Sequence, residues 1–140
     1  MSESELRNES KKRKIPLNGI YSKDNLPEPS INGYFIVNMQ NSIDGNGTHW
    51  IAMIKDNNNN YYFDSFGCIA PVEICNYLND FKYNEKEIQD VDSKACGWFC
   101  LDFLQKMSNP TLTNLNNFIN SYKNDTTLND AILKNHLQTS

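Results

Sequence analysis

The sequence predicts an α+β fold in which a small, mostly antiparallel sheet packs against helices. Three short apolar runs lie close together at 34–39, 49–54 and 61–66, and their aromatic and β-branched residues are typical of strands. From Pro71 onward the apolar residues recur at helical spacing instead. With 140 residues the chain has room for one compact domain, and it is too short for a TIM barrel or a full Rossmann dehydrogenase.

Turn-forming residues separate the three predicted strands. Asp44, Gly45, Asn46 and Gly47 lie between the first two, and the run 55–60, Lys-Asp-Asn-Asn-Asn-Asn, lies between the second and the third. Asn and Asp tolerate the left-handed backbone that hairpin turns need. We therefore expect an antiparallel meander, with a further short strand around Ile88.

The best-defined helix is predicted at 96–107, and Asn109-Pro110 ends it. Its apolar positions form one continuous stripe along one face, made of Cys96, Phe99, Cys100, Phe103, Leu104 and Met107. Pro71 can begin an earlier helix that carries Ile74 and Leu78. Two weaker helices are expected near 113–123 and 127–137.

Residues 1–14 are polar and charged and show no apolar periodicity, so we expect a mobile tail ahead of a single domain at 15–140. The basic run Lys11, Lys12, Arg13 and Lys14 has three interpretations, namely a localisation signal, a contact for nucleic-acid phosphates, or a solvated tail. The net charge of −4 argues against a domain that coats nucleic acid.

The chain contains no run of 18 apolar residues, and its first residues lack the apolar core of a signal peptide. We therefore expect a monomer in a reducing compartment, neither secreted nor in a membrane. Four cysteines are then expected as thiols. Cys68 and Cys75 lack the paired spacing of a zinc site, so we expect no metal centre.

Four residues could together carry out nucleophilic catalysis, namely Cys96, His49, Asp64 and Gln89. The chain has two histidines, and His136 lies four residues from the C-terminal residue, so His49 is the candidate base. Each of the four also has a structural interpretation. Cys96 could be a buried thiol, His49 a core residue, Asp64 a turn cap and Gln89 an ordinary loop residue.

Strand pairing provides a geometric check on His49 and Asp64. Opposite residues of an antiparallel ladder have a constant sum of residue numbers and share a face. His49 and Asp64 sum to 113, and an odd sum places both side chains on one face. Sums of 113 or 115 would centre the turn on the Asp56–Asn58 stretch, which favours turns. The imidazole and the carboxylate are then direct or diagonal neighbours.

Cys96 is expected at the N-terminus of its helix, where the helix dipole favours a thiolate. The Cys96 backbone amide has no acceptor within the first turn, so it could bind an oxyanion together with the Gln89 amide. Gly97 is expected to leave space beside the sulfur. Trp50 faces away from His49 on its strand and should pack in the core, as should Cys100.

These motifs resemble those of the adenain family, the maturation peptidases of adenoviruses. The resemblance rests on Gly-Thr-His49-Trp50, on Tyr-Tyr-Phe-Asp64-Ser-Phe-Gly67, and on Gln89 followed after six residues by Ala-Cys96-Gly-Trp-Phe-Cys100. Related peptidases occur in virophages and Maverick/Polinton elements, and more distant ones process ubiquitin-like proteins. Gly19-Ile20-Tyr21 and Asn109-Pro110-Thr111 extend the similarity over most of residues 18–133.

The resemblance implies the site roles. Cys96 is the nucleophile, His49 the base, Asp64 the orienting acid and Gln89 the oxyanion donor, and Tyr77 matches an aromatic that the family places near the histidine. The resemblance also implies activation by DNA or by a peptide. A disulfide-linked activator is not expected, because Leu78 stands where the family has the linking cysteine.

The implied function is a cysteine endopeptidase that cleaves viral capsid or other structural precursors near glycine, in the virion and the infected host cell. Nothing in the sequence indicates that the reaction requires a cofactor. Two alternatives stay open. One is a peptidase that acts on ubiquitin-like modifiers, and the other is a catalytically silent binding module with the same fold.

Overall fold

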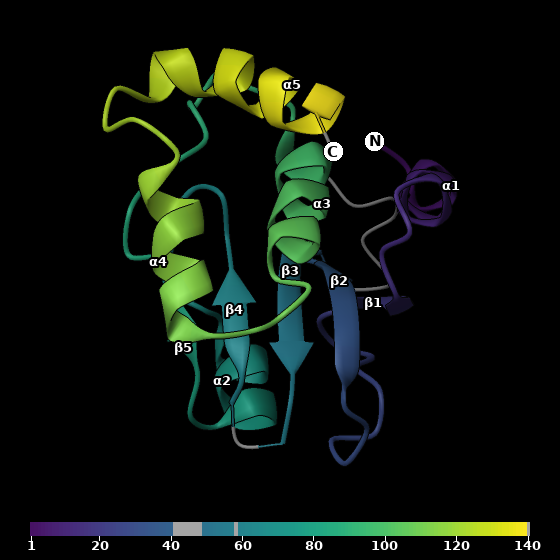
Figure 1. Cartoon of the computed structure of the whole chain (residues 1–140). Helices are drawn as coiled ribbons and strands as arrows, with labels where there is room; N and C mark the ends of the chain where they lie inside the picture. Colours follow the sequence, from purple (N-terminus) through teal and green to yellow (C-terminus); the bar gives the residue numbers. More distant parts are fainter. Residues whose placement is uncertain (41–48, 58, 140) are drawn as a thin grey trace.

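The computed structural model describes residues 1–40, 49–57 and 59–139 and has the predicted α+β fold (Figure 1). Its strands are β1 (Leu17–Ser22), β2 (Gly33–Asn38), β3 (Trp50–Lys55), β4 (Tyr61–Phe63) and β5 (Lys82–Tyr83). Its helices are α1 (Glu3–Lys12), α2 (Val72–Leu78), α3 (Cys96–Lys106), α4 (Leu112–Asn120) and α5 (Asn129–Thr139), with a short 3₁₀ turn, η2 (Thr126–Leu128), before α5.

The described strands form one sheet in the order β1-β2-β3-β4-β5. The two inner ladders, β2–β3 and β3–β4, are antiparallel as expected. The outer strands pair in parallel, β1 with β2 and β5 with β4, so the sheet is mixed. The turn expected at Asp44–Gly47 lies outside the described residues.

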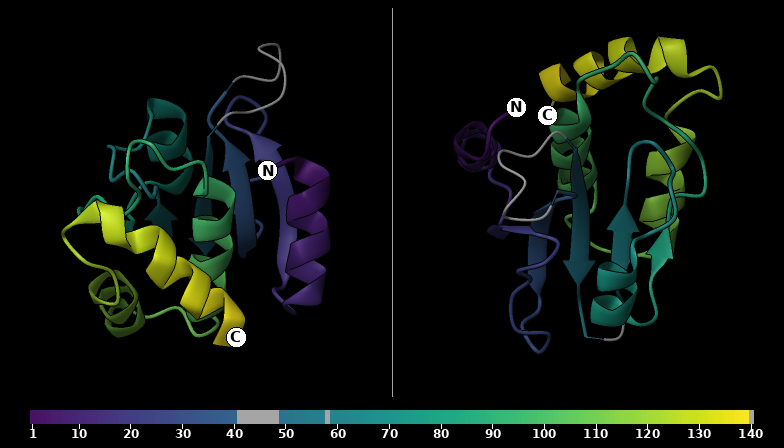
Figure 2. Two further views of the ribbon diagram at one scale, coloured as in Figure 1. Left: turned by 90° about the horizontal axis from the view of Figure 1, so that it is seen from above. Right: turned by 180° about the vertical axis from the view of Figure 1, so that it is seen from behind.

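The central strand β3 is buried on both faces, which explains its nearly continuous apolar sequence. Trp50, Ala52 and Ile54 belong to one core cluster, which also contains the apolar stripe of α3. Ile51 and Met53 belong to a second cluster with α2. Figure 2 shows α3 and α2 on opposite sides of the sheet. The sheet therefore separates two cores, and the larger one contains α3.

The predicted stripe of α3 is confirmed as the centre of the larger core. Phe103 stacks on Phe63 of β4, with ring centroids 4.8 Å apart and planes 9° apart. Phe118 of α4 meets both rings edge-on. Asp102, on the same helix, is 0% exposed and accepts hydrogen bonds from Tyr122 and His136. Aromatic packing and one buried carboxylate thus join α3 to the chain around α4 and α5.

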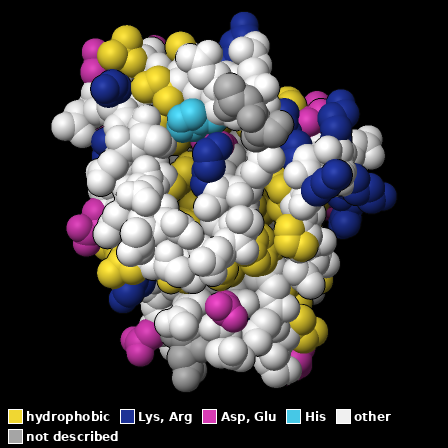
Figure 3. Space-filling model, viewed as in Figure 1, with side chains coloured by type: hydrophobic (Ala, Val, Ile, Leu, Met, Phe, Trp, Pro, Cys, Tyr) yellow, Lys and Arg dark blue, Asp and Glu magenta, His cyan; other side chains and the backbone are white. Residues whose placement is uncertain are grey.

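The expectation of a mobile tail at 1–14 is wrong, because residues 3–12 form helix α1. Ser2 caps the helix in a capping box with Glu5, and Leu6 is 0% exposed against the larger core. Only one strongly apolar residue lies in this helix, so the sequence shows no periodicity. A cluster of Lys and Arg side chains lies on the side of the molecule where α1 is, and others are scattered over the same face (Figure 3).

One strand was not foreseen, and one further expectation needs correction. The segment 15–29 contains β1, whose pairing with β2 is parallel and nonlocal. The residues around Ile88 are not a strand; Ile88 is buried in a loop, and the short strand β5 lies earlier, at Lys82–Tyr83. Of the helices described, none combines the length and the apolar character needed to cross a membrane.

Candidate active site

Cys96 is the first residue of α3, as the sequence predicts, and its side chain points into the molecule. The residue is 7% exposed, and its Sγ accepts a hydrogen bond from the Trp50 backbone amide at 3.5 Å. This bond connects the head of α3 to the start of β3. A thiolate at this position is favoured by the positive end of the helix dipole and by the amide donor.

His49 and Asp64 lie on the same side of the β3–β4 hairpin, as the parity argument predicts. Each pair in that ladder sums to 115, for example Ala52 with Phe63. Extending the register makes His49 and Asp64 diagonal neighbours. The Nε2 atom of His49 lies 2.8 Å from Oδ1 of Asp64, and Asp64 is 2% exposed. The carboxylate therefore fixes the orientation of the imidazole from a buried position.

Asp64 is itself held firmly by its surroundings. Its Oδ1 accepts a second hydrogen bond from the Phe66 amide at 2.9 Å. Its backbone amide donates to Oδ1 of Asn84, and Nδ2 of Asn84 donates to its carbonyl. Gly67 completes the turn with a φ of +70°, where a Cβ would lie 2.9 Å from the Glu87 amide nitrogen. The acid is thus positioned by backbone and side chain together.

The protonation equilibria of His49 and Cys96 shift in opposite directions. Burial by itself lowers the pKa of His49, but its interactions with Asp64 and Cys96 outweigh this effect and raise the pKa to about 9. Burial opposes ionisation of Cys96, yet its interactions with His49 and the Trp50 amide hold its pKa below the ordinary value. The pair is therefore poised toward imidazolium and thiolate.

The second imidazole nitrogen, Nδ1 of His49, is buried and has no close hydrogen-bond partner among the described residues. Because Nε2 is engaged with Asp64, Nδ1 is the nitrogen that can exchange a proton with the thiol. Catalytic hydrogen bonds are often loose in a site without substrate and tighten when substrate binds. The arrangement therefore suits proton transfer between Cys96 and His49.

The aromatic partner of His49 is Phe66, which the sequence did not single out for this role. Its ring centroid lies 4.9 Å from that of His49. The expectation that Tyr77 occupies this place is wrong. Tyr77 packs in the α2 core, where its ring lies 5.5 Å from Nζ of Lys55, at the end of β3 farthest from His49, and its hydroxyl donates to the Glu28 carbonyl at 3.4 Å.

Gln89 lines the same cavity as Cys96. The Ser65 hydroxyl donates to Gln89 Oε1, and the backbone amide of Gln89 donates to the Ser65 carbonyl. Its Nε2 donates to the Ser93 carbonyl at 2.9 Å. Ser65 directly follows Asp64 in the chain. The two hydrogen bonds between Ser65 and Gln89 therefore attach the 84–93 loop to the end of β4 and bring Gln89 to the site.

The cavity at Cys96 has a volume of about 360 Å³. Its lining residues are Met1, Trp50, Phe66, Gln89, Ser93, Lys94 and Cys96. Trp50 also packs in the larger core, as expected. The expectation that Gly97 leaves open space beside the sulfur is wrong, because the Met1 side chain fills that space.

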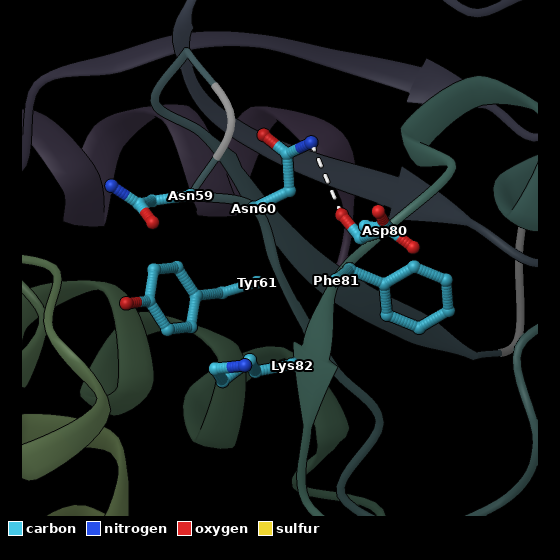
Figure 4. A pocket seen from close by; sticks show the side chains of 6 residues that line it. All are labelled: Asn59, Asn60, Tyr61, Asp80, Phe81 and Lys82. Carbon is cyan, nitrogen blue, oxygen red and sulfur yellow. Dashed lines mark hydrogen bonds between the residues drawn. The ribbon is translucent and has the colours of Figure 1, made fainter.

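A second hollow lies in another part of the sheet. The described residues that line it include none of the four candidate catalytic residues, Cys96, His49, Asp64 and Gln89. Asn60, Asp80 and Lys82 contribute to its wall (Figure 4). The Asn60 amide donates to the Asp80 carbonyl at 3.3 Å across it. The Asn60 amide ties the start of β4 to the segment before β5, which is a structural role. The candidate catalytic residues lie instead at the cavity of Cys96.

Two contributors to the site, Phe66 and Met1, escaped the sequence reasoning. Phe66 lies two residues after Asp64, and the hairpin register that pairs His49 diagonally with Asp64 also places Phe66 beside the imidazole. For Met1 the available signal was the capping box of Ser2 and Glu5, which indicates a helix start directly after it.

No protein-family model and no curated protein matches the sequence. Two crystal structures of the ASFV pS273R protease resemble the fold. The selenomethionine form has a TM-score of 0.51 at 18% identity over 74% of this chain and 43% of that chain. The other has a TM-score of 0.51 at 15% identity over 81% of this chain and 44% of that chain.

The chain thus spans less than half the length of the protease it matches. At these identities the likeness shows the fold alone. The fold expected from the adenain resemblance is confirmed as that of a viral protease, and the comparisons do not single out the adenovirus type.

Proposed function

We propose that the chain is a cysteine peptidase with Cys96 as nucleophile, His49 as base and Asp64 as the acid that orients it. The observation that carries this proposal is the buried bond of 2.8 Å between His49 and Asp64, with the Cys96 thiol at the head of α3 on the other side of the imidazole. The fold similarity to a viral protease supports it.

In the proposed reaction the Cys96 thiolate attacks the scissile carbonyl carbon and forms a tetrahedral oxyanion. The oxyanion collapses, the C–N bond breaks, and His49 donates its Nδ1 proton to the leaving amine. Water then attacks the thioester while His49 takes its proton, the C–S bond breaks, and the acid product is released with the thiolate–imidazolium pair restored. Asp64 holds the ring and stabilises the imidazolium throughout.

The proposed oxyanion donors are the Cys96 backbone amide and the Gln89 side chain. An amide in the first turn of a helix has no intrahelical acceptor. Gln89 Nε2 carries two hydrogens, and its contact with Ser93 Oγ is the longer of its two, at 3.3 Å. That hydrogen can turn toward an oxyanion while the bond to the Ser93 carbonyl keeps the amide in place.

The proposed substrates are viral capsid or other structural precursors, cleaved near glycine in the virion or the infected cell. Ubiquitin-like proteins are the competing substrate class. A fluorogenic peptide from a capsid-precursor junction and a reporter with a ubiquitin-like C-terminus distinguish the two. Faster turnover of the capsid peptide supports the proposed substrate class. Faster turnover of the ubiquitin-like reporter would instead assign the peptidase to ubiquitin-like proteins.

The direct test is co-expression with the viral structural proteins, followed by mass spectrometry of the products. Wild-type protein should cut a precursor that the Cys96→Ser variant leaves intact. Cys100→Ser is the matched control, because Cys100 is fully buried one turn along the same helix and burial raises its pKa well above the ordinary value. Equal, intact precursor in all three samples would favour the silent binding module.

Contact with nucleic acid through Lys11, Lys12, Arg13 and Lys14 stays a prediction. Glu9 takes an ion pair from Lys12 and another from Arg13, which reduces the charge available to phosphates. A change in peptidase rate when DNA is added, compared at low and high salt, measures this contact.

A further inference from the structure

The first residues of the chain reach the cavity around Cys96. Met1 lines it together with Trp50 and Gln89. The Met1 carbonyl accepts a hydrogen bond from the Trp50 indole Nε1 at 2.8 Å, and Trp50 also donates its backbone amide to the Cys96 sulfur. One tryptophan therefore holds both Met1 and the nucleophile.

The packing of helix α1 fixes the position of Met1. Ser2 begins the helix with a capping box, so Met1 projects from a rigid helix start. Leu6 lies one turn later with no exposed surface and packs in the larger core. At the far end, the guanidinium carbon of Arg13 lies 5.7 Å from the centre of the Trp98 ring on α3. Helix α1 thus packs against the first turn of α3, at Gly97 and Trp98, with its own N-terminus at the cavity.

The absence of a side chain at Gly97 is what makes room for Met1. A Cβ on Gly97 would lie 2.8 Å from Met1 Sδ and 3.3 Å from Leu6 Cδ2. The thioether thus occupies the space beside the residue that follows the nucleophile. Methionine is apolar and flexible and fills irregular gaps well.

We propose that Met1 is a specificity-determining residue of the peptidase, a wall that limits the size of the substrate side chain seated beside the Cys96 sulfur. The proposal rests on the proposed function. Trp50 holds the Met1 carbonyl and the thioether lies against Gly97 at the cavity edge, so a small substrate side chain passes and a bulky one collides with it. Helix α1 belongs to the substrate cleft.

The test measures both access to the sulfur and substrate choice. Wild-type protein and Met1→Ala are prepared by cleaving an N-terminal fusion partner so that each begins at residue 1. Gly97→Ala is the second variant, because its new methyl displaces the flexible end of Met1 while alanine favours the helix. Arg7→Ala is the control on the same helix, since Arg7 pairs with the exposed Glu3.

Two readouts separate this proposal from the proposed function. The first is alkylation of Cys96 by iodoacetamide and by a bulky pyrenyl maleimide, measured residue by residue by mass spectrometry. The second is kcat/KM for two peptides that differ only by a small or a bulky residue at the scissile bond. Met1→Ala and Gly97→Ala should each raise the bulky-to-small ratio about tenfold in both readouts, and Arg7→Ala should leave it unchanged.

If the bulky-to-small ratios of alkylation and of kcat/KM are unchanged in Met1→Ala, Met1 does not limit the size of the substrate side chain. A rise in the alkylation ratio in a protein that cuts no peptide would keep Met1 as the wall of the cavity and reject the peptidase. An equal rise in Arg7→Ala would show that loosening of α1, and not loss of the thioether, opens the site, which also overturns the role of Met1.

Discussion

The imidazole of His49 is bound to the buried carboxylate of Asp64 across a diagonal step of the β3–β4 ladder, with Nε2 and Oδ1 2.8 Å apart. The bond leaves Nδ1 for the thiol, and although burial lowers the pKa of His49, the interactions with Asp64 and Cys96 together raise it to about 9. The hairpin register thus places the base, and the head of α3 brings the nucleophile to it. The following predictions test consequences of this geometry.

Asp64→Asn should reduce peptidase activity by up to about 10⁴-fold without abolishing it. The amide keeps the shape of the side chain but removes the negative charge that favours the imidazolium. The measurement is kcat/KM on a capsid-precursor peptide. Asp92→Asn, an exposed change in the loop before α3, is the matched control. Full wild-type activity in Asp64→Asn would remove this residue from the site.

Activity should fall on the alkaline side as His49 loses its proton, with an apparent pKa near 9. The sign follows from the raised pKa, because the imidazolium persists up to that value and is lost above it. On the acid side, activity should fall as Cys96 becomes protonated, below the ordinary cysteine pKa. The two apparent values belong to the coupled pair.

The pH profile of kcat/KM in wild-type protein and Asp64→Asn checks this prediction. Loss of the carboxylate lowers the pKa of His49, so the alkaline limb should move to lower pH. An alkaline limb that stays in place in the variant would show that another group titrates there.

Phe66→Ala should lower kcat about threefold to tenfold, because its ring packs 4.9 Å from that of His49 and limits the movement of the imidazole. Tyr77→Phe is the comparison, since it removes only a hydroxyl that bonds to the Glu28 carbonyl, on a ring that lies beside Lys55 at the end of β3 farthest from His49. Steady-state kinetics of both variants measures the difference. A larger loss of kcat in Tyr77→Phe would contradict the assignment of Phe66.

Asp102→Ala should destabilise the fold by about 3 kcal/mol, because it leaves a group of polar partners without their buried acceptor. Tyr122, His136 and Lys106 all donate to this carboxylate, which is 0% exposed. Urea unfolding followed by circular dichroism gives the free energy, with exposed Asp92→Ala as control. A change of under 1 kcal/mol would show that aromatic packing alone holds α4 and α5.

Two features of the site could be predicted from the sequence because they depend on local residue patterns. Alternation along a strand and the asparagine-rich turn fix the β3–β4 register, so the shared face of His49 and Asp64 could be read from their numbers. The apolar stripe that begins at Cys96 likewise placed the thiol at a helix start. Both features depend on neighbours close in the chain.

The remaining features depend on contacts between distant segments. Tyr77 was matched to an aromatic of the family by spacing alone, and spacing along α2 does not reveal that its ring lies beside Lys55, at the end of β3 farthest from His49. The parallel strand β1 is fixed only by its pairing with β2. Helix α1 has few apolar residues, and its burial through Leu6 could not be read from periodicity. Its capping box was the one local signal.

The most direct test of the central claim is the rate at which each cysteine is alkylated by iodoacetamide at pH 6.5, read by mass spectrometry in wild-type protein and His49→Ala. The imidazolium stabilises the Cys96 thiolate, so Cys96 should react faster than the exposed Cys68 in wild type and should lose that advantage in the variant. If Cys96 reacts more slowly than Cys68 in wild type, or at the same rate with and without His49, the thiol and the imidazole do not act as a pair.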